Sequence, residues 1–489
     1  MAESLKEKTG RGVGWSFGGS LASYGITFVV GIILARRLGP ELYGLVGVIT
    51  IFVTIFNTIV DSGFSNALIR KIDATEKDYN TVFLVNLIVS IGLYGILFVA
   101  SPFIAVFFGK EQLNPLTRVM GVCVIINAFS LIQSTLLTKE IDFKTITKCQ
   151  VISSFFSGVL GVLMAYQDCG VWSLVGQQIS YKLFNTILLW FYRKWYPHFI
   201  FSYSSFKELW GFGWKLLVTS LINTIWNELY QVVIGKCYST QTLGYYTKAK
   251  EYVAIVSNNL TSVVQRVSYP ALSKIQNDND RLKRGYKMVI KVTMLVTFVL
   301  VLGLAACAHN FVLILIGTEW LPSVPFLQLI CFNMMLYPLH AINLNMLQVA
   351  GRSDLFLKVE IVKKIIAIIP FLLGVFINIY WMLGASIFVG FVSFFLNAYY
   401  SGPFLNYGAL EQLKDIFPDF GIALCVAIVV FVIGIIPANI YFVLFIQLMV
   451  GALLTITLCE VIKLEEYYEC KDIALGAIRN IKSNVIKSF

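Results

Sequence analysis

The sequence predicts an all-α, polytopic membrane protein with about fourteen transmembrane helices. Of its 489 residues, 57% are hydrophobic and only 13% are charged, whereas soluble domains carry roughly a quarter charged residues. The mean hydropathy is +0.77. Apolar segments of about 20 residues, the length that crosses a bilayer core, recur along the whole sequence. No stretch is both long and polar enough to form a separate soluble domain.

The predicted spans follow from these apolar segments, with ends uncertain by a few residues. They are 13–35, 43–68, 80–107, 116–138, 148–166, 171–192, 212–235, 247–269, 288–316, 322–349, 357–378, 382–400, 416–436 and 439–461. The basic start and the apolar run after it resemble a signal peptide, but the run is too long for an h-region and no A-x-A-like site follows it. We therefore interpret it as a retained first helix.

The placement of Lys and Arg predicts the orientation. With the N-terminus inside, only Arg36, Arg37, Lys110 and Lys236 fall in outer connections, and most of the others fall in inner ones. This bias predicts that both termini are cytoplasmic, and it accounts for the net charge of +11 without nucleic acid. The basic tail is interpreted either as an amphipathic helix on the anionic inner leaflet or as a plain solvated tail.

The nine cysteines include no C-x-x-C pair, and most lie in apolar segments, where a thiol behaves as a small hydrophobe. The sequence therefore predicts no metal site, no obligatory disulfide and no cofactor.

An internal repeat of about 200 residues divides the chain. Gly12-Val13-Gly14-Trp15 recurs as Gly211-Phe212-Gly213-Trp214, and Tyr43-Gly44 recurs as Leu243-Gly244. Six spans per repeat predict two parallel lobes around a central cavity, the type of transporter that handles substrate between its halves. The predicted division is an N-lobe (1–192), a cytoplasmic linker (193–211), a C-lobe (212–400), two added helices (401–461) and a basic tail (462–489).

A line of polar residues marks the second span. Thr50, Thr54, Asn57 and Asp61 follow one another at helical spacing and share one face. A polar line that ends in a carboxylate indicates a water-filled path inside a helix bundle. Polar residues on other spans are Asn127 on the fourth, Lys182 on the sixth, Asn223, Asn227 and Glu228 on the seventh, and Glu251, Asn258 and Arg266 on the eighth. Each small polar residue taken singly is more often a helix–helix contact.

The charges inside spans carry more weight, because one charge at the bilayer centre costs about 2.5–3.5 kcal/mol on insertion scales. Asp61, Lys182 and Arg266 therefore require partners or water, as does Glu228. The partner of Asp61 is left open between Lys182, Arg266 and a bound ion. The balance of these charges is cationic and favours an anionic substrate with phosphate or carboxylate groups.

Several motifs resemble a known family. "ARRLGPELYGLVGV" (Ala35 to Val48), "DSGFSNALIRK" (Asp61 to Lys71), "LGYYTKA" (Leu243 to Ala249) and "YPALSKIQND" (Tyr269 to Asp278) are similar to the signature of bacterial polysaccharide flippases. These are Wzx-type exporters of lipid-linked oligosaccharides in the multidrug/oligosaccharidyl-lipid/polysaccharide superfamily, and the likeness is greatest to the colanic and teichuronic acid exporter branch. The resemblance implies a two-lobed bundle whose first, second, seventh and eighth helices line a cavity and rock between inward- and outward-open states.

The resulting hypothesis is a non-enzymatic flippase of the bacterial inner membrane that moves an undecaprenyl-diphosphate-linked oligosaccharide by ion-coupled alternating access. The glycan would be a repeat unit of O-antigen, capsule or exopolysaccharide. The expected partners are the lipid-linked oligosaccharide, membrane lipids, a polysaccharide polymerase and assembly proteins, but no nucleic acid.

No catalytic residues are expected, and the candidate residues fall into two sets. The cavity and substrate set is Asn57, Asp61, Arg70, Lys71, Lys182, Asn223, Asn227, Asn258, Arg266 and Lys274. The coupling-ion set is Asp61, Glu228 and Glu251.

Three alternatives stay open. A cation-coupled multidrug antiporter of the same superfamily would favour carboxylates over Lys and Arg in its cavity. A membrane glycan polymerase or glycosyltransferase would place a substantial catalytic loop outside, whereas the predicted outer loops are short and nearly uncharged. The third alternative is a non-transporting scaffold for a glycan-synthesis complex. Loss of surface glycan together with normal flipping in vitro would favour it.

Overall fold

The computed structural model describes residues 5–61, 63–274, 278–349 and 352–472. Every regular element in these ranges is a helix, with sixteen α-helices and two 3-10 helices, so the predicted all-α class is confirmed. The chain forms two compact units, Met1–Thr247 and Lys248–Phe489. The division falls inside one long helix, whereas the sequence repeat places the lobe boundary in the linker 193–211, which remains a prediction.

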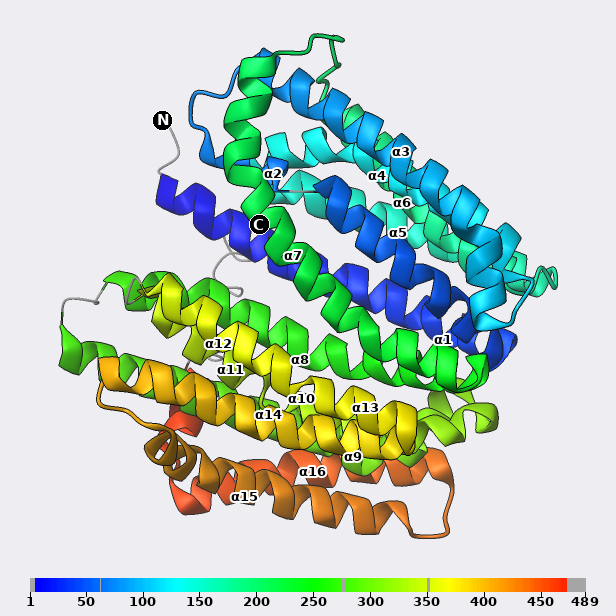
Figure 1. Ribbon diagram of the computed structural model, residues 1–489. Coiled ribbons are helices and arrows are strands. Elements are labelled where there is room, and N and C mark those ends of the chain that lie inside the picture. Colours follow the sequence, from blue (N-terminus) through cyan, green and yellow to red (C-terminus); the bar gives the residue numbers. More distant parts are fainter. Residues whose placement is uncertain (1–4, 62, 275–277, 350–351, 473–489) are drawn as a thin grey trace, which may run out of the picture. The chain divides into compact units, whose positions relative to one another are not determined.

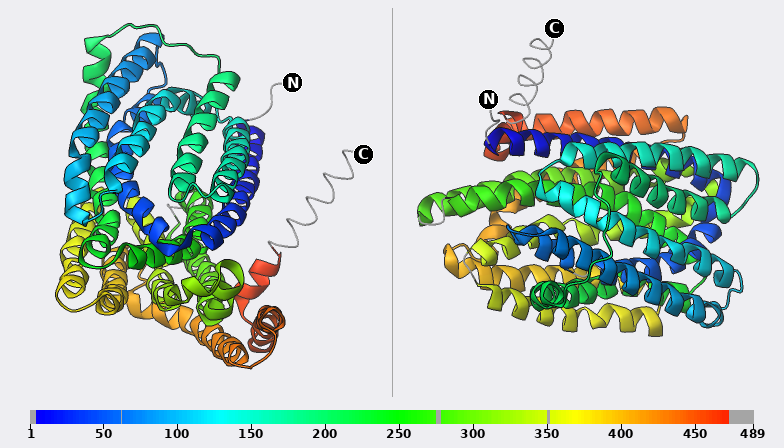
Figure 2. Two further views of the ribbon diagram at one scale, coloured as in Figure 1. Left: turned by 90° about the vertical axis from the view of Figure 1, so that its right-hand side faces the viewer. Right: turned by 90° about the horizontal axis from the view of Figure 1, so that it is seen from above.

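Unit 1 contains seven helices and the start of an eighth, which can be followed in Figure 1. They are α1 (Leu5–Asp61), α2 (Phe64–Arg70), α3 (Glu76–Phe108), α4 (Leu113–Lys139), α5 (Phe143–Tyr166), α6 (Trp172–Tyr192), α7 (Tyr203–Cys237) and α8 (Thr240–Lys274). Figure 2 shows α3, α4, α5 and α6 lying alongside one another, with α4 in contact with both α3 and α6. This packing brings polar residues of α1, α4 and α6 into one region.

The first two predicted spans are joined by a kink and not by the expected loop over 35–44. Helix α1 runs through both, and its one non-helical residue is Gly39, with φ 69° and ψ 171°. Positive φ is readily adopted by glycine, and Pro40 follows it with no backbone N–H to donate. The motif around Gly39 therefore acts as a sharp bend between two continuous helices.

Two glycines matched by the sequence repeat face each other in unit 1. A Cβ added at Gly44 would overlap the Thr240 carbonyl, and one added at Gly244 would overlap the Pro40 carbonyl. The second half of α1 and the start of α8 therefore approach at backbone distance. Only glycine permits this contact, which gives the repeated glycine a packing role.

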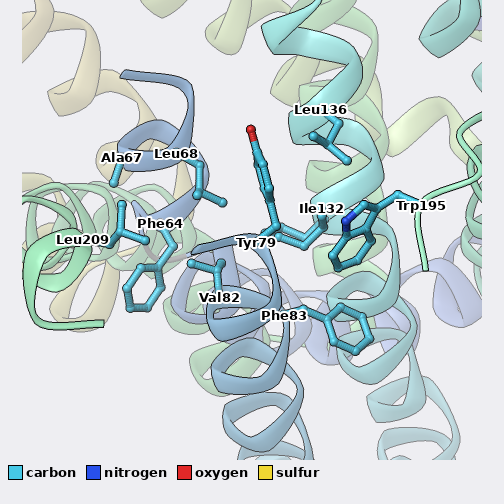
Figure 3. Packing of buried hydrophobic residues seen from close by; sticks show 11 residues of the cluster. Phe64, Ala67, Leu68, Tyr79, Val82, Phe83, Ile132, Leu136, Trp195 and Leu209 are labelled. Carbon is cyan, nitrogen blue, oxygen red and sulfur yellow. The ribbon is translucent and has the colours of Figure 1, made fainter. Parts of the chain in front are cut away.

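A buried cluster joins α2, α3, α4 and α7 in unit 1 (Figure 3). Its members are Phe64, Ala67, Leu68, Tyr79, Val82, Phe83, Leu131, Ile132, Leu136, Trp195 and Leu209. Trp195 belongs to the connection before α7, and its Nε1 donates to Glu76 Oε2 at 2.8 Å. The backbone N–H of Ser202 donates to Thr81 Oγ1 at 3.0 Å. The linker is thus fastened along the first turns of α3.

Unit 2 contains the rest of α8 and the later helices. They are α9 (Asn279–Ile316), η1 (Thr318–Ser323), α10 (Val324–Met334), α11 (Tyr337–Val349), α12 (Ser353–Ile366), α13 (Ile368–Phe376), α14 (Ile379–Ser401), η2 (Gly402–Phe404), α15 (Ala409–Gly434) and α16 (Ile440–Ile462). Helix α9 packs against α10, α15 and α16, and α14 packs against α10, α11 and α13.

A polar hub ties four of these helices together. Asn343 Oδ1 accepts from Tyr286 Oη at 2.8 Å, from Ser401 Oγ at 2.7 Å and from Gln412 Nε2 at 3.1 Å. Its Nδ2 donates to Gln412 Oε1 at 3.0 Å and to the Leu339 carbonyl at 3.1 Å. A fully paired polar network in an apolar interior specifies a unique packing, so we interpret this hub as structural.

Proline accounts for the interruptions in two predicted spans. The span predicted over 322–349 forms as α10 and α11, and Pro338 lies in the first turn of α11. The span predicted over 357–378 breaks at Ala367, between α12 and α13, three residues before Pro370. Proline removes an N–H and its ring clashes with the carbonyl four residues earlier, so both breaks lie where that clash would fall.

Within the described ranges, nine helical stretches are long and apolar enough to cross a membrane, by length and composition only. One of them, Ala22–Arg70, holds two predicted spans on either side of the Gly39 kink. The predicted spans that are not among these nine stretches form as α6, α7, α8 and the α12–α13 pair. Helices α7 and α8 carry the polar residues that lower hydropathy, and α12 and α13 are each shorter than a span.

Candidate functional site

The polar line on α1 has two kinds of members. Thr50 Oγ1 donates to the Val46 carbonyl at 2.8 Å. This hydroxyl is satisfied within its own helix. By contrast, Asn57 Oδ1 is buried and accepts no hydrogen bond from any described group. The lower part of the line, from Asn57 to Asp61, therefore carries the polar groups with unused capacity.

Asp61 lies at the end of a chain of hydrogen bonds that crosses three helices. Asn127 of α4 donates through Nδ2 to Asp61 Oδ1 at 3.1 Å. Lys182 of α6 donates through Nζ to Asn127 Oδ1 at 3.2 Å. The Asn127 amide must take this orientation, because only its NH₂ can donate to a carboxylate and only its oxygen can accept from an ammonium.

This chain assigns the partner of Asp61 that the sequence left open. Of the candidates whose side chains the structure describes, Lys182 faces Asp61 through the intervening Asn127 amide. The Asn127 side chain is 9% exposed, Lys182 is half-buried and Asp61 is exposed. The three residues, here named the relay, bring a cation and an anion together with no net charge inside an apolar unit. Because the Asn127 amide separates the Lys182 ammonium from the Asp61 carboxylate, each charge can still bind a further ligand.

The relay retains hydrogen-bonding capacity on both sides. A Lys ammonium has three donors and a carboxylate has about four acceptor sites. Among the described groups, Lys182 Nζ gives one hydrogen bond and Asp61 accepts one, both involving Asn127. An anion can therefore approach Lys182 and a proton or small cation can approach Asp61 without the relay being dismantled. Such a site suits reversible ion recognition.

The two basic residues after α1 have different surroundings. Lys71 Nζ lies 2.9 Å from Glu208 Oε2 and 3.2 Å from Asp78 Oδ2. The hydrogen bonds that Lys71 donates to Glu208 and Asp78 raise the pKa of Lys71. Arg70 is exposed and stacks on the Phe212 ring, 4.5 Å from its centroid. Lys71 is therefore neutralised within unit 1, whereas Arg70 presents its guanidinium to solvent.

Candidate residues on α7 and at the start of unit 2 form local pairs. Glu228 accepts from Gln231, one turn further along α7. Asn223 and Asn227 are exposed on the same helix. Glu251 pairs with Lys248 at 2.9 Å, and the Lys248 side chain is 2% exposed where that of Glu251 is 37% exposed. None of these residues belongs to the relay.

Three candidates cannot be placed. The side chains of Asn258, Arg266 and Lys274 lie outside the described part of the structure.

Sequence reasoning missed the central member of the relay as a site residue. Asn127 was noted on the fourth span, but its amide was not expected to join two charges. The signal available was its position near the middle of the span 116–138, at a depth similar to that of Lys182 in the span 171–192, which crosses in the same direction. The carboxylates that hold Lys71 were also not anticipated.

The comparisons with known proteins begin with a family model. Residues 33–325, more than half of the chain, match the family described as "Polysaccharide biosynthesis protein". The teichuronic acid biosynthesis protein TuaB of Bacillus subtilis (strain 168) is 30% identical over 306 residues, which are 62% of this chain and 63% of that protein. The chain thus aligns with slightly less than two thirds of TuaB.

Two further relatives align over more of their length. The succinoglycan biosynthesis transport protein ExoT of Rhizobium meliloti (strain 1021) is 26% identical over 334 residues, 68% of each chain. The lipopolysaccharide biosynthesis protein WzxC of Escherichia coli (strain K12) is 24% identical over 373 residues, 76% of each chain.

Solved structures share the fold at low identity. The lipid II flippase MurJ in an inward closed conformation superposes with a TM-score of 0.73 at 13% identity, covering 91% of this chain and 98% of that one. An inward-facing multidrug resistance MATE transporter of the MOP superfamily gives 0.61 at 16% identity, covering 78% and 95%. From the family match over residues 33–325 we conclude that this chain belongs to the polysaccharide biosynthesis protein family.

Proposed function

We propose that this protein moves a lipid-linked oligosaccharide from the inner to the outer leaflet of the bacterial cytoplasmic membrane. The relay carries the proposal, because it holds a cation and an anion with unused capacity among apolar helices. Membership of a polysaccharide biosynthesis family supports the substrate class, as does the similarity to ExoT, a succinoglycan biosynthesis transport protein. The substrate would be an undecaprenyl-diphosphate-linked repeat unit.

In this proposal Lys182 recognises the anionic diphosphate. A lone charge at the bilayer centre costs about 2.5–3.5 kcal/mol, so an unsatisfied Lys182 would favour any anion that reaches it. Arg70 would attract the headgroup at the inner end of α2, since it is exposed beside Phe212. Lys71 would take part only by exchanging its carboxylate partners for the diphosphate. Asn223 and Asn227, exposed on α7, would meet the sugar hydroxyls.

Asp61 is the coupling-ion candidate that the relay supports best. Protonation of Asp61 would remove the negative charge that faces Lys182 through Asn127 and would leave the ammonium available to an anion. By linkage, proton binding at Asp61 and anion binding at Lys182 would favour each other. Glu228 and Glu251 remain further coupling candidates, the latter as a pair with Lys248.

The membrane potential would assist this direction of transport. Moving one elementary charge through 100 mV corresponds to about 2.3 kcal/mol, so an inside-negative potential drives an anionic headgroup outward by roughly twice that if it carries two charges. With cytoplasmic termini, as the Lys and Arg bias predicts, Arg70 would lie at the inner mouth, where the substrate enters.

A second candidate is a cation-coupled multidrug antiporter, which the MATE fold likeness supports. Lys182 opposes this candidate, because a cationic drug at Asp61 would face the ammonium through only one amide. An enzyme with an outer catalytic loop is not supported either. The connections between α3 and α4, between α5 and α6 and between α7 and α8 are each a few residues long.

The proposal is tested with purified protein in vesicles loaded with a fluorescent undecaprenyl-diphosphate oligosaccharide. Flipping is followed by a membrane-impermeant quencher, with a fluorescent organic cation as the competing substrate. We expect flipping of the lipid-linked oligosaccharide and no uptake of the cation. Loss of flipping in Asp61→Asn combined with Arg266→Gln is the expected result. Undiminished transport by that double variant would contradict the cavity assignment.

A further inference from the structure

A second group of buried charges lies in unit 2 and shares no residue with the proposed transport site. Asp419 of α15 and Glu466, just after α16, are both 0% exposed. Lys291 of α9 lies with its Nζ 2.6 Å from Glu466 Oε2, and its side chain is 16% exposed. The group therefore combines two buried carboxyl groups with one ammonium.

The hydrogen bonding of this group is incomplete. Neither Asp419 oxygen accepts a hydrogen bond from any described donor. The group that faces the Asp419 carboxyl is the carboxyl of Glu466. Two ionised carboxylates can only accept, so they cannot satisfy each other. One proton between them supplies the missing donor and creates the short, charge-assisted bond typical of a carboxylic acid and a carboxylate.

The charge balance leads to the same conclusion. With all three groups ionised, the cluster carries a net charge of −1 where no solvent reaches either carboxyl. Taking an uncompensated ion out of water costs several kcal/mol, and like charges in one site cannot both ionise without a large penalty. Binding one proton brings the cluster to neutrality with Lys291.

Among the residues that the structure describes, neighbouring ionisable groups do not provide a second compensating cation. Asp415, one turn earlier on α15, is engaged by Lys287 at 2.8 Å and by Tyr407 Oη at 2.7 Å. The other ionisable groups whose fields reach the cluster are acidic or thiols: Glu465 and Glu469 on the segment after α16, Cys459 on α16, and Cys470. These neighbours make the surroundings more negative and favour proton uptake.

The cluster determines how the chain continues after α16. Lys463 takes a left-handed conformation, with φ 58°, and turns the chain back toward the bundle. Leu464 then enters an apolar cluster with Leu295 of α9, Ile422 of α15 and Cys459 of α16. Glu466 follows within two residues and meets Lys291 and Asp419. The segment 464–466 is therefore held by the Leu464 side chain, by the Leu464 N–H, which donates to the Cys459 carbonyl at 3.2 Å, and by the Glu466 carboxyl. A helical stretch over 465–472 begins within it, and Tyr467 of that stretch packs against the same apolar cluster.

We propose that Asp419 and Glu466 form a proton-binding pair that fastens segment 464–466 to α9 and α15, and that loss of the proton releases this segment. Without the proton the cluster is left with a buried negative charge. Moving Glu466 into solvent relieves it at least cost, because Glu466 lies in the first turn of the helical stretch 465–472 beyond α16, whereas Asp419 is fixed within the longer helix α15. Release would also uncover part of Cys459, which is 0% exposed and lies in one apolar cluster with Leu464 of this segment. This inference does not depend on the proposed transport function.

The test uses the full-length protein in lipid nanodiscs, with Cys459 kept and the other eight cysteines replaced by serine. The maleimide labelling rate of Cys459 is measured between pH 5.5 and 8.5 and divided by the rate for the same protein in denaturing detergent with urea. This ratio removes the pH dependence of the thiol itself. Since release of one proton shifts a population up to tenfold per pH unit, we expect the ratio to rise by about tenfold or more across this range.

Two variants and a matched control make the result decisive. In Asp419→Asn the amide donates permanently to Glu466, and in Glu466→Gln the amide donates permanently to Asp419, so both are expected to label slowly at every pH. Asp415→Asn, on the same helix but paired with Lys287, is expected to keep the pH dependence of the parent. Size-exclusion profiles identical to the parent establish that the variants are folded.

Three results would overturn the inference. A flat labelling ratio in the parent means that no proton controls the segment. If the labelling ratio keeps its pH dependence in both Asp419→Asn and Glu466→Gln, another group controls the segment. The third result is a labelling ratio that is lower in NaCl than in choline chloride at the same pH. It would mean that the pair binds a metal cation and not a proton.

Discussion

Lys182 offers the sharpest mutational test of the relay, through the substitution Lys182→Met. The methionine keeps much of the side-chain volume but removes the ammonium that balances Asp61 through Asn127. The variant loses a charge-assisted hydrogen bond, which contributes about 1.5–3 kcal/mol, and leaves Asp61 uncompensated. Because Asp61 is exposed in the structure, we expect the lower part of this range, about 2 kcal/mol.

The assay is a double-mutant cycle on the thermal unfolding of the purified protein in micelles. At about 2–4 °C per kcal/mol for a unit of 150–250 residues, Lys182→Met should lower Tm by about 4–8 °C. Asp61→Asn with Lys182→Met should recover part of this loss, because no charge is then left unpaired, giving a coupling energy of about 1–2 kcal/mol. Lys207→Met, on an exposed position of α7, should change stability by less than about 0.5 kcal/mol. Additive effects of the two single substitutions would refute the relay.

Three further predictions follow from other contacts. Gly244→Ala should destabilise the protein strongly, because its Cβ would overlap the Pro40 carbonyl, whereas Gly25→Ala meets nothing within 4 Å and should be neutral or slightly stabilising in thermal unfolding. The carboxylates beside Lys71 raise its pKa above 10.5, so the stability they give is present below that pH and disappears as pH rises through the raised value. Glu208→Gln should therefore lower Tm at pH 7–9, with the difference from the parent vanishing in strongly alkaline solution. Asn343→Ala should cost about 2–4 kcal/mol in unfolding free energy, since it leaves several buried polar groups unpaired; a loss below about 1 kcal/mol would mean that the hub is not structural.

Hydropathy predicted the helices of this fold well, because length and apolar composition are local properties of a spanning segment. Local backbone chemistry was harder to anticipate. The stretch around Gly39 was expected to form a connector, but a single residue at positive φ suffices to bend one continuous helix. Helix α7 begins at Tyr203, nine residues before its predicted start, because Ser202 Oγ accepts from the Ser205 N–H and caps it. The cap signal was present in the sequence but lay outside the apolar run.

The candidate site was predictable only in part. The helical spacing of Asn57 and Asp61 indicated a polar face on one helix, since periodicity is written in the sequence. The partners of that face come from α4 and α6, which meet α1 only in the folded protein, so the role of Asn127 could not be read from spacing. For Lys71 the sequence indicated the charge but not its partner. Glu208, which accepts a hydrogen bond from Lys71, is 137 residues away in the chain.

The most direct test of the central claim is the flipping rate of vesicles that contain Lys182→Gln, compared with Lys182→Arg and with Lys207→Gln as the exposed control. Equal amounts of folded protein are reconstituted, and the outward appearance of a fluorescent undecaprenyl-diphosphate oligosaccharide is measured. The account predicts that Lys182→Gln loses most transport, that Lys182→Arg keeps a substantial part of it, and that Lys207→Gln matches the parent. Parent-level flipping by Lys182→Gln would contradict the claim that this ammonium recognises the substrate.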